Sequence, residues 1–248
     1  MPTDRRHRFA LPALCLLLTL LLCLSAYLLT GARLSRRAVS AEATVPPAAP
    51  FTRVVIDAGH GGEDGGAQSA SGIPEKQINL QVAQYLRAYL EAVGIPTVMT
   101  RTEDKLLYDP TAAYKGRKKQ LDLAARLEIA TAVPNSLFVS IHMNAYPDPR
   151  YSGMQVWYSP GNPLSEQVAA RIQTEALRLT PQNRRRIKAA GSNIFLLDRL
   201  NTPAVLVEGG FLSNPEEAAR LGTKAYQRRL AFLLFTAITD EMYASQGE

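Results

Sequence analysis

The sequence predicts a single α/β domain, residues 51–248, with a mostly parallel open sheet that has helices on both faces and follows an N-terminal transmembrane segment. Short apolar runs alternate with longer stretches in which apolar residues recur at helical spacing. This alternation is typical of parallel sheets, because each crossover places a helix on one face. The length of 248 residues and the 46% share of hydrophobic residues suit one sizeable domain and an additional segment.

The expected elements follow from local patterns. Apolar residues at Ile78, Val82, Leu86 and Leu90 have helical spacing, and Gly94 ends that helix. Asn162 followed by a proline opens another helix, and Asn214 caps an acidic helix start after a turn at 211–215. Short apolar runs predict strands at 53–57, 95–101, 137–142, 153–158, 193–197 and 204–207, and helical spacing predicts helices at 75–93, 118–132, 163–179 and 224–244.

The first fifty residues have a different character. After a basic stub, residues 1–8, residues 9–32 carry no charge and include eleven leucines. At about 1.5 Å per residue, a helix of this length crosses a hydrocarbon core of about 30 Å. We expect a signal-anchor, with a cleaved signal peptide as the alternative, although the best small-x-small site, at 41–43, lies far beyond the apolar run. Residues 33–50, which end in three prolines, are expected to be a linker.

The net charge of +6 does not indicate a nucleic-acid partner. Six arginines and only two acids lie in the first fifty residues, so most of the basic excess flanks the apolar segment and the domain is nearly neutral. Both cysteines, Cys15 and Cys23, lie inside the apolar segment. The domain therefore has no disulfide, which suits a bacterial envelope protein better than a small secreted scaffold.

The two histidines of the domain both follow expected strands. His60 lies in the loop GHGGEDGGA and His142 ends the strand LFVSIH, so both belong at the edge of the sheet where ligands of such folds bind. The loop is not a dinucleotide loop, because Asp64 stands where the third glycine of G-x-G-x-x-G belongs and no G-K-S/T follows. Glu63 and Asp64 would repel a pyrophosphate, whereas a metal ion tolerates them; their own roles remain unassigned.

Two further carboxylates fit such a centre. Catalytic zinc usually takes three protein ligands and leaves one position for water. Glu75, in the first turn of helix 75–93, faces back towards the loop and is the candidate third ligand, unless it only complements the helix dipole. Glu208 ends an apolar strand before two glycines, where poor solvation raises a carboxyl pKa towards that of a useful base; the alternative is a structural acid that caps the next turn.

Four segments in this order resemble one family. IDAGHGGEDGGA, PEKQINL, FVSIHMNA and VLVEGGFLSN together resemble the zinc-dependent N-acetylmuramoyl-L-alanine amidases of the bacterial cell wall, over residues 53 to about 240. The resemblance implies one Zn²⁺ ion held by His60, Glu75 and His142, with Glu208 as general base. It implies hydrolysis of the amide between N-acetylmuramic acid and L-alanine in peptidoglycan.

Some further positions are interpreted beside this resemblance. Asp57 would orient His60 from behind, and Asn144 would touch the substrate. Arg126 matches a family position, which we interpret as structural rather than substrate-binding. The basic residues of 184–188 either contact an acidic wall polymer or a partner, or form a solvated turn. The tract PQNRRRIKAAGSNIFLL and the GFLSN ending are most similar to sporulation amidases, which help to make muramic lactam in spore cortex.

The expected location follows from the expected substrate. Peptidoglycan lies outside the cytoplasmic membrane, so the domain should face outwards, anchored by residues 9–32 or secreted. The expected partners are peptidoglycan and the membrane, and a protein activator is left open. Two alternatives remain: an inactive membrane-tethered wall-binding protein, and a zinc peptidase that cuts the stem peptide itself. The presence of all four expected site residues argues against loss of activity.

Overall fold

The computed structural model describes residues 18–26, 49–108 and 116–244. The chain divides into two compact units, Met1–Pro46 and Pro47–Glu248. In the first unit, residues 18–26 form an exposed helix. Across the described ranges, no helix combines the length and the apolar character needed to cross a membrane. The expected basic stub and most of the expected anchor and linker lie outside the described residues.

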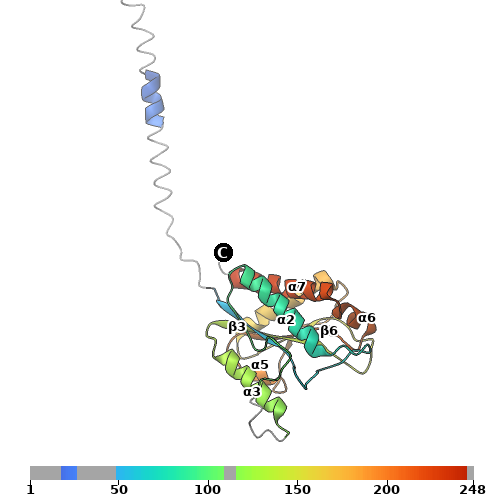
Figure 1. Cartoon of the computed structure of the whole chain (residues 1–248). Helices are drawn as coiled ribbons and strands as arrows, with labels where there is room; N and C mark the ends of the chain where they lie inside the picture. Colours follow the sequence, from blue (N-terminus) through green and yellow to red (C-terminus); the bar gives the residue numbers. More distant parts are fainter. Residues whose placement is uncertain (1–17, 27–48, 109–115, 245–248) are drawn as a thin grey trace, which may run out of the picture. The chain divides into compact units, whose positions relative to one another are not determined.

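The described part of the second unit is built on a six-stranded sheet with the strand order β2-β1-β3-β6-β4-β5 (Figure 1). The β1–β2, β1–β3, β3–β6 and β4–β5 pairs are parallel, and only the β4–β6 pair in this sheet is antiparallel. The prediction of a mostly parallel sheet is therefore confirmed. The strands are β1 (Arg53–Ala58), β2 (Thr97–Met99), β3 (Ser136–Asn144), β4 (Gln155–Tyr158), β5 (Lys188–Ala189) and β6 (Ala204–Phe211).

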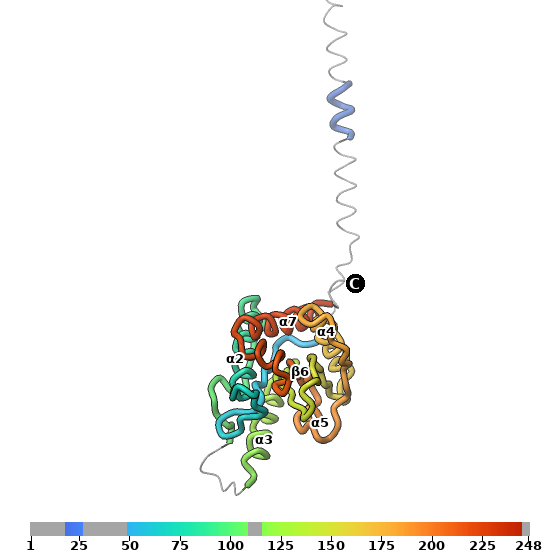
Figure 2. Tube along the Cα trace, turned by 90° about the vertical axis from the view of Figure 1, so that its right-hand side faces the viewer, coloured from blue at the N-terminus to red at the C-terminus, as the bar shows by residue number. Residues whose placement is uncertain are grey.

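Helices cover both faces of the sheet (Figures 1 and 2). One face carries α2 (Glu75–Ala92), α4 (Pro163–Leu179) and α7 (Lys224–Tyr243), and the other carries α3 (Lys118–Thr131) and α5 (Phe195–Arg199). The short α6 (Pro215–Leu221) follows β6. The expected caps are confirmed: the Asn162 side chain accepts a hydrogen bond from the amide of Leu164, and the Asn214 side chain accepts one from the amide of Glu217.

Alternation along the strands builds two cores, because successive side chains of a strand point to opposite faces. In β1, Val54 and Ile56 belong to the larger core under α2, α4 and α7, while Val55 belongs to the smaller core under α3 and α5. Strands β3 and β6 alternate in the same way, with Phe138 and Ala204 in the smaller core. The alternation also decides which polar side chains of these strands share a face.

The expected strand at 193–197 is wrong, because the structure has helix α5 there. A short apolar run fits a buried strand or a buried helical turn equally well. Here Leu196 and Leu197 are both buried, and the amides of Asp198 and Leu200 donate hydrogen bonds to carbonyls four residues earlier. The strand in this region is instead β5, whose two residues are exposed and carry no apolar signal. The expected strand at 95–101 shortens to β2.

Candidate active site

The alternation that builds the two cores also aims two polar side chains. His142 lies four residues after Phe138, and Glu208 lies four residues after Ala204, so both point to the face that carries α3 and α5. They are direct Cα partners on the parallel strands β3 and β6. A cavity of about 240 Å³ opens on both residues and is walled partly by Leu123 of α3.

His60 is brought to the same place by the loop after β1. Its backbone has a φ of 61°, in the left-handed region that few side chains adopt. The guanidinium of Arg126 donates a hydrogen bond to the His60 carbonyl at 2.8 Å and so holds this backbone. The preceding residue must be small: a Cβ on Gly59 would lie 2.2 Å from Nε2 of His142. The two histidine rings then meet edge to face, with centroids 4.9 Å apart.

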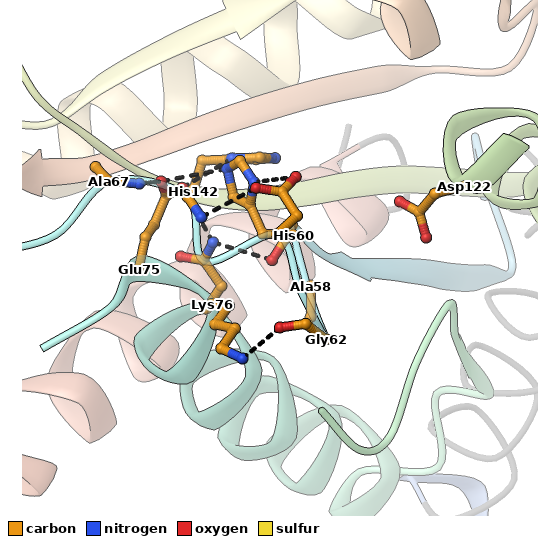
Figure 3. Close-up of polar contacts among 12 residues, drawn as sticks. Ala58, His60, Gly62, Ala67, Glu75, Lys76, Asp122 and His142 are labelled. Carbon is orange, nitrogen blue, oxygen red and sulfur yellow. Dashed lines mark hydrogen bonds and ion pairs between the residues drawn. The ribbon is translucent and has the colours of Figure 1, made fainter. Parts of the chain in front are cut away.

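Glu75 reaches both histidines from the first turn of α2 (Figure 3). Its Oε2 lies 3.2 Å from Nε2 of His60, and its Oε1 lies 2.9 Å from Nδ1 of His142. The amides of Ala67 and Met143 and the side chain of Asn79 also donate hydrogen bonds to the carboxylate. These donors hold the carboxylate rigidly, as a ligand or a structural acid requires.

The helix that carries Glu75 starts without a side-chain cap. Its first amides, those of Glu75 and Lys76, donate to the carbonyls of Ala67 and Gly65 in the loop that carries His60. Lys76 also donates to the carbonyl of Gly62 at 2.6 Å (Figure 3). The loop and the helix start are thus one unit, so His60 and Glu75 are positioned together.

His60, Glu75 and His142 fit a metal centre. Each offers one ligand atom, and these atoms lie within 4.8 Å of one another. Tetrahedral zinc with bonds of about 2.0–2.1 Å needs ligand atoms roughly 3.3 Å apart, so small side-chain movements suffice. Burial alone would raise the pKa of the Glu75 carboxyl, but hydrogen bonds with His142 and His60 hold it well below its usual range. The site therefore keeps the anionic form that metal binding needs.

The carboxylate behind His60 is Asp64, not Asp57. Nδ1 of His60 lies 2.8 Å from Oδ2 of Asp64, and Oδ1 of the same carboxylate accepts a hydrogen bond from the amide of Gly66. This contact fixes the tautomer and orientation of the ring, as carboxylates do behind metal-bound histidines. His60 and Asp64 are four residues apart in the sequence. This spacing predicts a contact only in a helix, and the glycine-rich loop does not have the pattern of a helix. The adjacent Glu63 instead pairs with Lys118 at 2.7 Å.

Asp57 belongs to a buried charge network below the site. It accepts hydrogen bonds from Thr100, Ser140 and Arg126. Arg126 also pairs with Asp122 at 2.7 Å and donates to the carbonyls of Ala58 and His60. Asp57 is thus connected to His60 through Arg126, which contacts both residues. The structural interpretation of Arg126 agrees with this geometry, because both charged ends are buried.

Glu208 has the environment of a base. Its Oε2 atom is out of contact with solvent and has no hydrogen-bond partner among the described residues. Burial raises the pKa of Glu208 to about 6, and the negative charge of Glu75 adds to the rise, while His142, His60 and Arg185 oppose it. The direction of this shift agrees with the expectation from the sequence. Asn144, two residues beyond His142, lies half-buried at the end of β3 beside Phe211 of β6.

The model of the N-acetylmuramoyl-L-alanine amidase family matches residues 54–240, which include all four of these site residues.

The chain belongs to this family.

The amidase is 37% identical over 186 residues to the germination-specific N-acetylmuramoyl-L-alanine amidase of Bacillus subtilis, a match that covers 75% of this chain and 77% of that protein. Among solved structures, the CwlD amidase of Clostridioides difficile in complex with the GerS lipoprotein is 33% identical, with a TM-score of 0.73 over 78% of this chain and 99% of that one. The catalytic domain of the CwlV amidase of Bacillus (Paenibacillus) polymyxa is 29% identical, with a TM-score of 0.66 over 79% and 99%. The chain is thus a hydrolase that acts on peptidoglycan, which confirms the predicted activity.

Proposed function

We propose that this amidase cleaves the amide between N-acetylmuramic acid and L-alanine with one Zn²⁺ ion, held by His60, Glu75 and His142, and with Glu208 as general base. The observation that carries the proposal is the convergence of two histidine rings on one buried carboxylate, one strand away from a second carboxylate with an unpaired buried oxygen. The donor set of two histidines and one glutamate is a known set for catalytic zinc.

Different residues of the chain have different roles in the reaction. Bound zinc would supply Lewis acidity for the water and the scissile carbonyl. Glu208 takes a proton from the attacking water at its unpaired Oε2 and delivers it to the departing amine of L-alanine. Asp64 holds the His60 ring in place, and Asn144 contacts the substrate at the end of β3. The products are a peptide-free lactyl carboxylate and a peptide with a new amino terminus.

The biological setting that we propose is the spore cortex, where muramic lactam is made after removal of the stem peptide. Two observations support it: the similarity to the germination-specific amidase of Bacillus subtilis, and the likeness to CwlD. The domain would act outside the cytoplasmic membrane, attached through residues 9–32 or released after cleavage. Because CwlD was solved with a lipoprotein, we also propose that this chain has a protein partner that regulates it.

Digestion of purified vegetative and spore peptidoglycan, with and without added zinc, tests the proposal. We expect zinc-dependent release of new L-alanine amino termini and, by mass spectrometry, glycan fragments with intact, peptide-free lactyl groups. Cleavage inside the stem would instead indicate a peptidase, and no cleavage would indicate a wall-binding protein without activity.

The Glu208→Gln variant tests the division of roles. It should lose turnover by at least about 10²–10⁴-fold, because general-base catalysis contributes on that scale. Zinc content, measured by elemental mass spectrometry, should stay at the wild-type value. Loss of zinc in this variant would make Glu208 a ligand and overturn the assignment.

A further inference from the structure

A second depression is lined by Arg185, whose side chain contacts Gln155, the strand partner of the proposed catalytic carboxylate. It encloses about 620 Å³ and is formed by the segment before β4, the segment before β5 and the region of α6. Four arginines, Arg150, Arg184, Arg185 and Arg220, line it. We call this depression the arginine bowl.

Arg185 connects the bowl to the active site. Its Nε donates to the carbonyl of Ser152 at 2.8 Å, and its Nη1 donates to Oε1 of Gln155 at 3.0 Å. Its guanidinium carbon lies 4.4 Å from the centroid of the Phe211 ring. Gln155 is the direct Cα partner of Glu208 on the antiparallel β4–β6 pair. Arg185 is therefore fixed in place one strand away from the proposed base.

Among the described residues, none of the three acids that line the bowl, Asp148, Glu216 and Glu217, forms an ion pair with Arg185. Asp148 pairs with Arg150 at 2.7 Å. Glu217 accepts hydrogen bonds from the amides of Gly153 and Phe211, and its remaining ion pair, at 3.6 Å, is with Arg220.

Within the described ranges, Arg185 therefore has only neutral oxygen partners, and its Nη2 meets no protein acceptor. Its side chain is half-buried. A guanidinium held out of full solvent contact without an ion pair favours an incoming anion, and its planar donor edge matches a carboxylate.

We propose that Arg185 binds a carboxylate of the stem peptide, on the peptide side of the amide that is cut. This inference rests on the proposed function. The stem continues from L-alanine into an acidic glutamyl residue, whereas the N-acetylated sugars of the glycan are neutral. Two extended residues of the stem peptide span about 7 Å. Facing residues on paired strands, such as Gln155 and Glu208, are about 5 Å apart. A carboxylate on the second stem residue can therefore reach Arg185, which contacts Gln155, while the amide lies at Glu208.

Two synthetic muramoyl tripeptides test the proposal. They have an amidated C-terminus and are identical except that the α-carboxyl of the second residue is free in one and amidated in the other. We expect the zinc-loaded full-length protein to prefer the free acid by about 10- to 100-fold in kcat/KM, mainly through KM, because a charge-assisted hydrogen bond is worth that much.

Variants assign the preference to one residue. Arg185→Met should reduce the preference to near unity by weakening cleavage of the acid alone, and Arg185→Lys should restore part of it. Arg184→Met is the matched control, because Arg184 lies in the same bowl, is exposed, and among the described residues donates only to the carbonyl of Pro181. This variant should leave the preference unchanged. Equal loss on both substrates in Arg185→Met would show a merely structural role and overturn the inference.

Digestion of polymeric peptidoglycan by the wild-type protein distinguishes a failure of the proposed carboxylate subsite from a failure of the proposed function. If the protein cleaves peptidoglycan but shows no preference between the tripeptides, the carboxylate subsite is refuted and the proposed function stands. If it cleaves neither peptidoglycan nor either tripeptide with zinc present, the proposed function is refuted and the subsite with it.

Discussion

Three side chains converge on His60, and each holds a different part of it. Asp64 contacts Nδ1, Glu75 lies beside Nε2, and Arg126 holds the backbone carbonyl in its left-handed conformation. The ring is therefore already ordered, with Nε2 towards the proposed metal position, and metal binding costs little additional conformational entropy. This preorganisation depends mostly on residues that would not bind the metal themselves.

Removing Asp64 should weaken metal binding without unfolding the protein. We expect Asp64→Ala to lower zinc affinity by about 10- to 100-fold, the usual effect of losing a carboxylate behind a histidine ligand. Competition with a chromogenic chelator measures this directly. The control is Glu63→Ala, because Glu63 pairs with Lys118 at the surface and does not contact His60. An equal loss in both variants would show that the charge of the loop, and not the contact with His60, sets the affinity.

A substitution at Gly59 tests whether the His142 ring needs its present position for metal binding. Its Cβ would collide with the His142 ring at 2.2 Å, whereas a Cβ on Gly65 would meet its nearest neighbour at 3.9 Å. We expect Gly59→Ala to displace the ring and abolish zinc binding and turnover, and Gly65→Ala to retain both. Wild-type zinc content in Gly59→Ala would show that the ring has room to move.

The four proposed site residues could be predicted because each lies at a boundary of a strand or helix that the local sequence pattern marks. His142 and Glu208 lie near the carboxyl ends of strands, His60 follows a strand, and Glu75 begins a helix. The partner of His60 could not be predicted in this way. Asp57 lies near the end of β1, where the sequence alone also suggests an acid that faces the site. The orientation of its carboxylate is set instead by hydrogen bonds from Thr100, Ser140 and Arg126, which come from distant parts of the chain.

At the scale of elements, one buried arginine joins α3 to β1. Arg126 is paired with Asp57 across the two elements at 2.6 Å and with Asp122 within the helix. Burial and these two acids act on Arg126 in opposite directions, and the acids prevail, so the pKa of Arg126 is raised and it stays charged. The contact orients α3, whose residue Leu123 lines the active-site cavity.

Breaking this pair should be costly. We expect Asp57→Asn to lower the free energy of unfolding by about 3–5 kcal/mol at pH 7, because it leaves part of a buried charge uncompensated. Urea unfolding followed by circular dichroism measures the change. The exposed pair of Arg87 and Glu91 provides the control, and Glu91→Gln should barely move the midpoint.

The same pair predicts the direction of a pH effect. Burial alone would raise the pKa of the Asp57 carboxyl, but Arg126 and hydrogen bonds from Ser140 and Thr100 hold it below its usual value. Its stabilising contribution is therefore fully present above the unfolded pKa of about 3.9 and is lost as the pH falls through the lower folded value. The stability gap between wild type and Asp57→Asn should be constant from pH 7 to 5 and should begin to narrow below pH 4. A gap that stays constant as the pH falls from 5 to 2 would contradict this origin.

Elements with long periodic patterns were predictable, and the shortest ones were not. Helices α2, α4 and α7 begin and end within one residue of the expected bounds, because their apolar stripes and start and stop signals agree. The segment 193–200 is rich in apolar residues but too short to show a period, so the sequence does not distinguish a strand from the helical turn that packs against α3. The pairing of β5 is equally invisible, since both of its residues are exposed.

At the scale of the whole molecule, the catalytic unit has a core of its own. The larger core begins at Phe51, which is fully buried, and the next residue donates a hydrogen bond to the carbonyl of Asn135. We expect a chain shortened to residues 47–248 to melt within about 2 °C of the full chain and to cleave the soluble tripeptides at the same rate, because no described core residue is removed. A large loss of melting temperature would show that the first unit contributes to the fold.

The reversed direction of β4 has a consequence for how such an enzyme can diversify. Because β4 runs antiparallel to β6, the segment 145–154 leaves β3 and enters β4 at the same end of the sheet, next to His142 and Glu208. Its length and sequence can change while both strands keep their register. A library restricted to residues 145–154 is therefore a natural starting point for changing the substrate range while His142 and Glu208 stay in place.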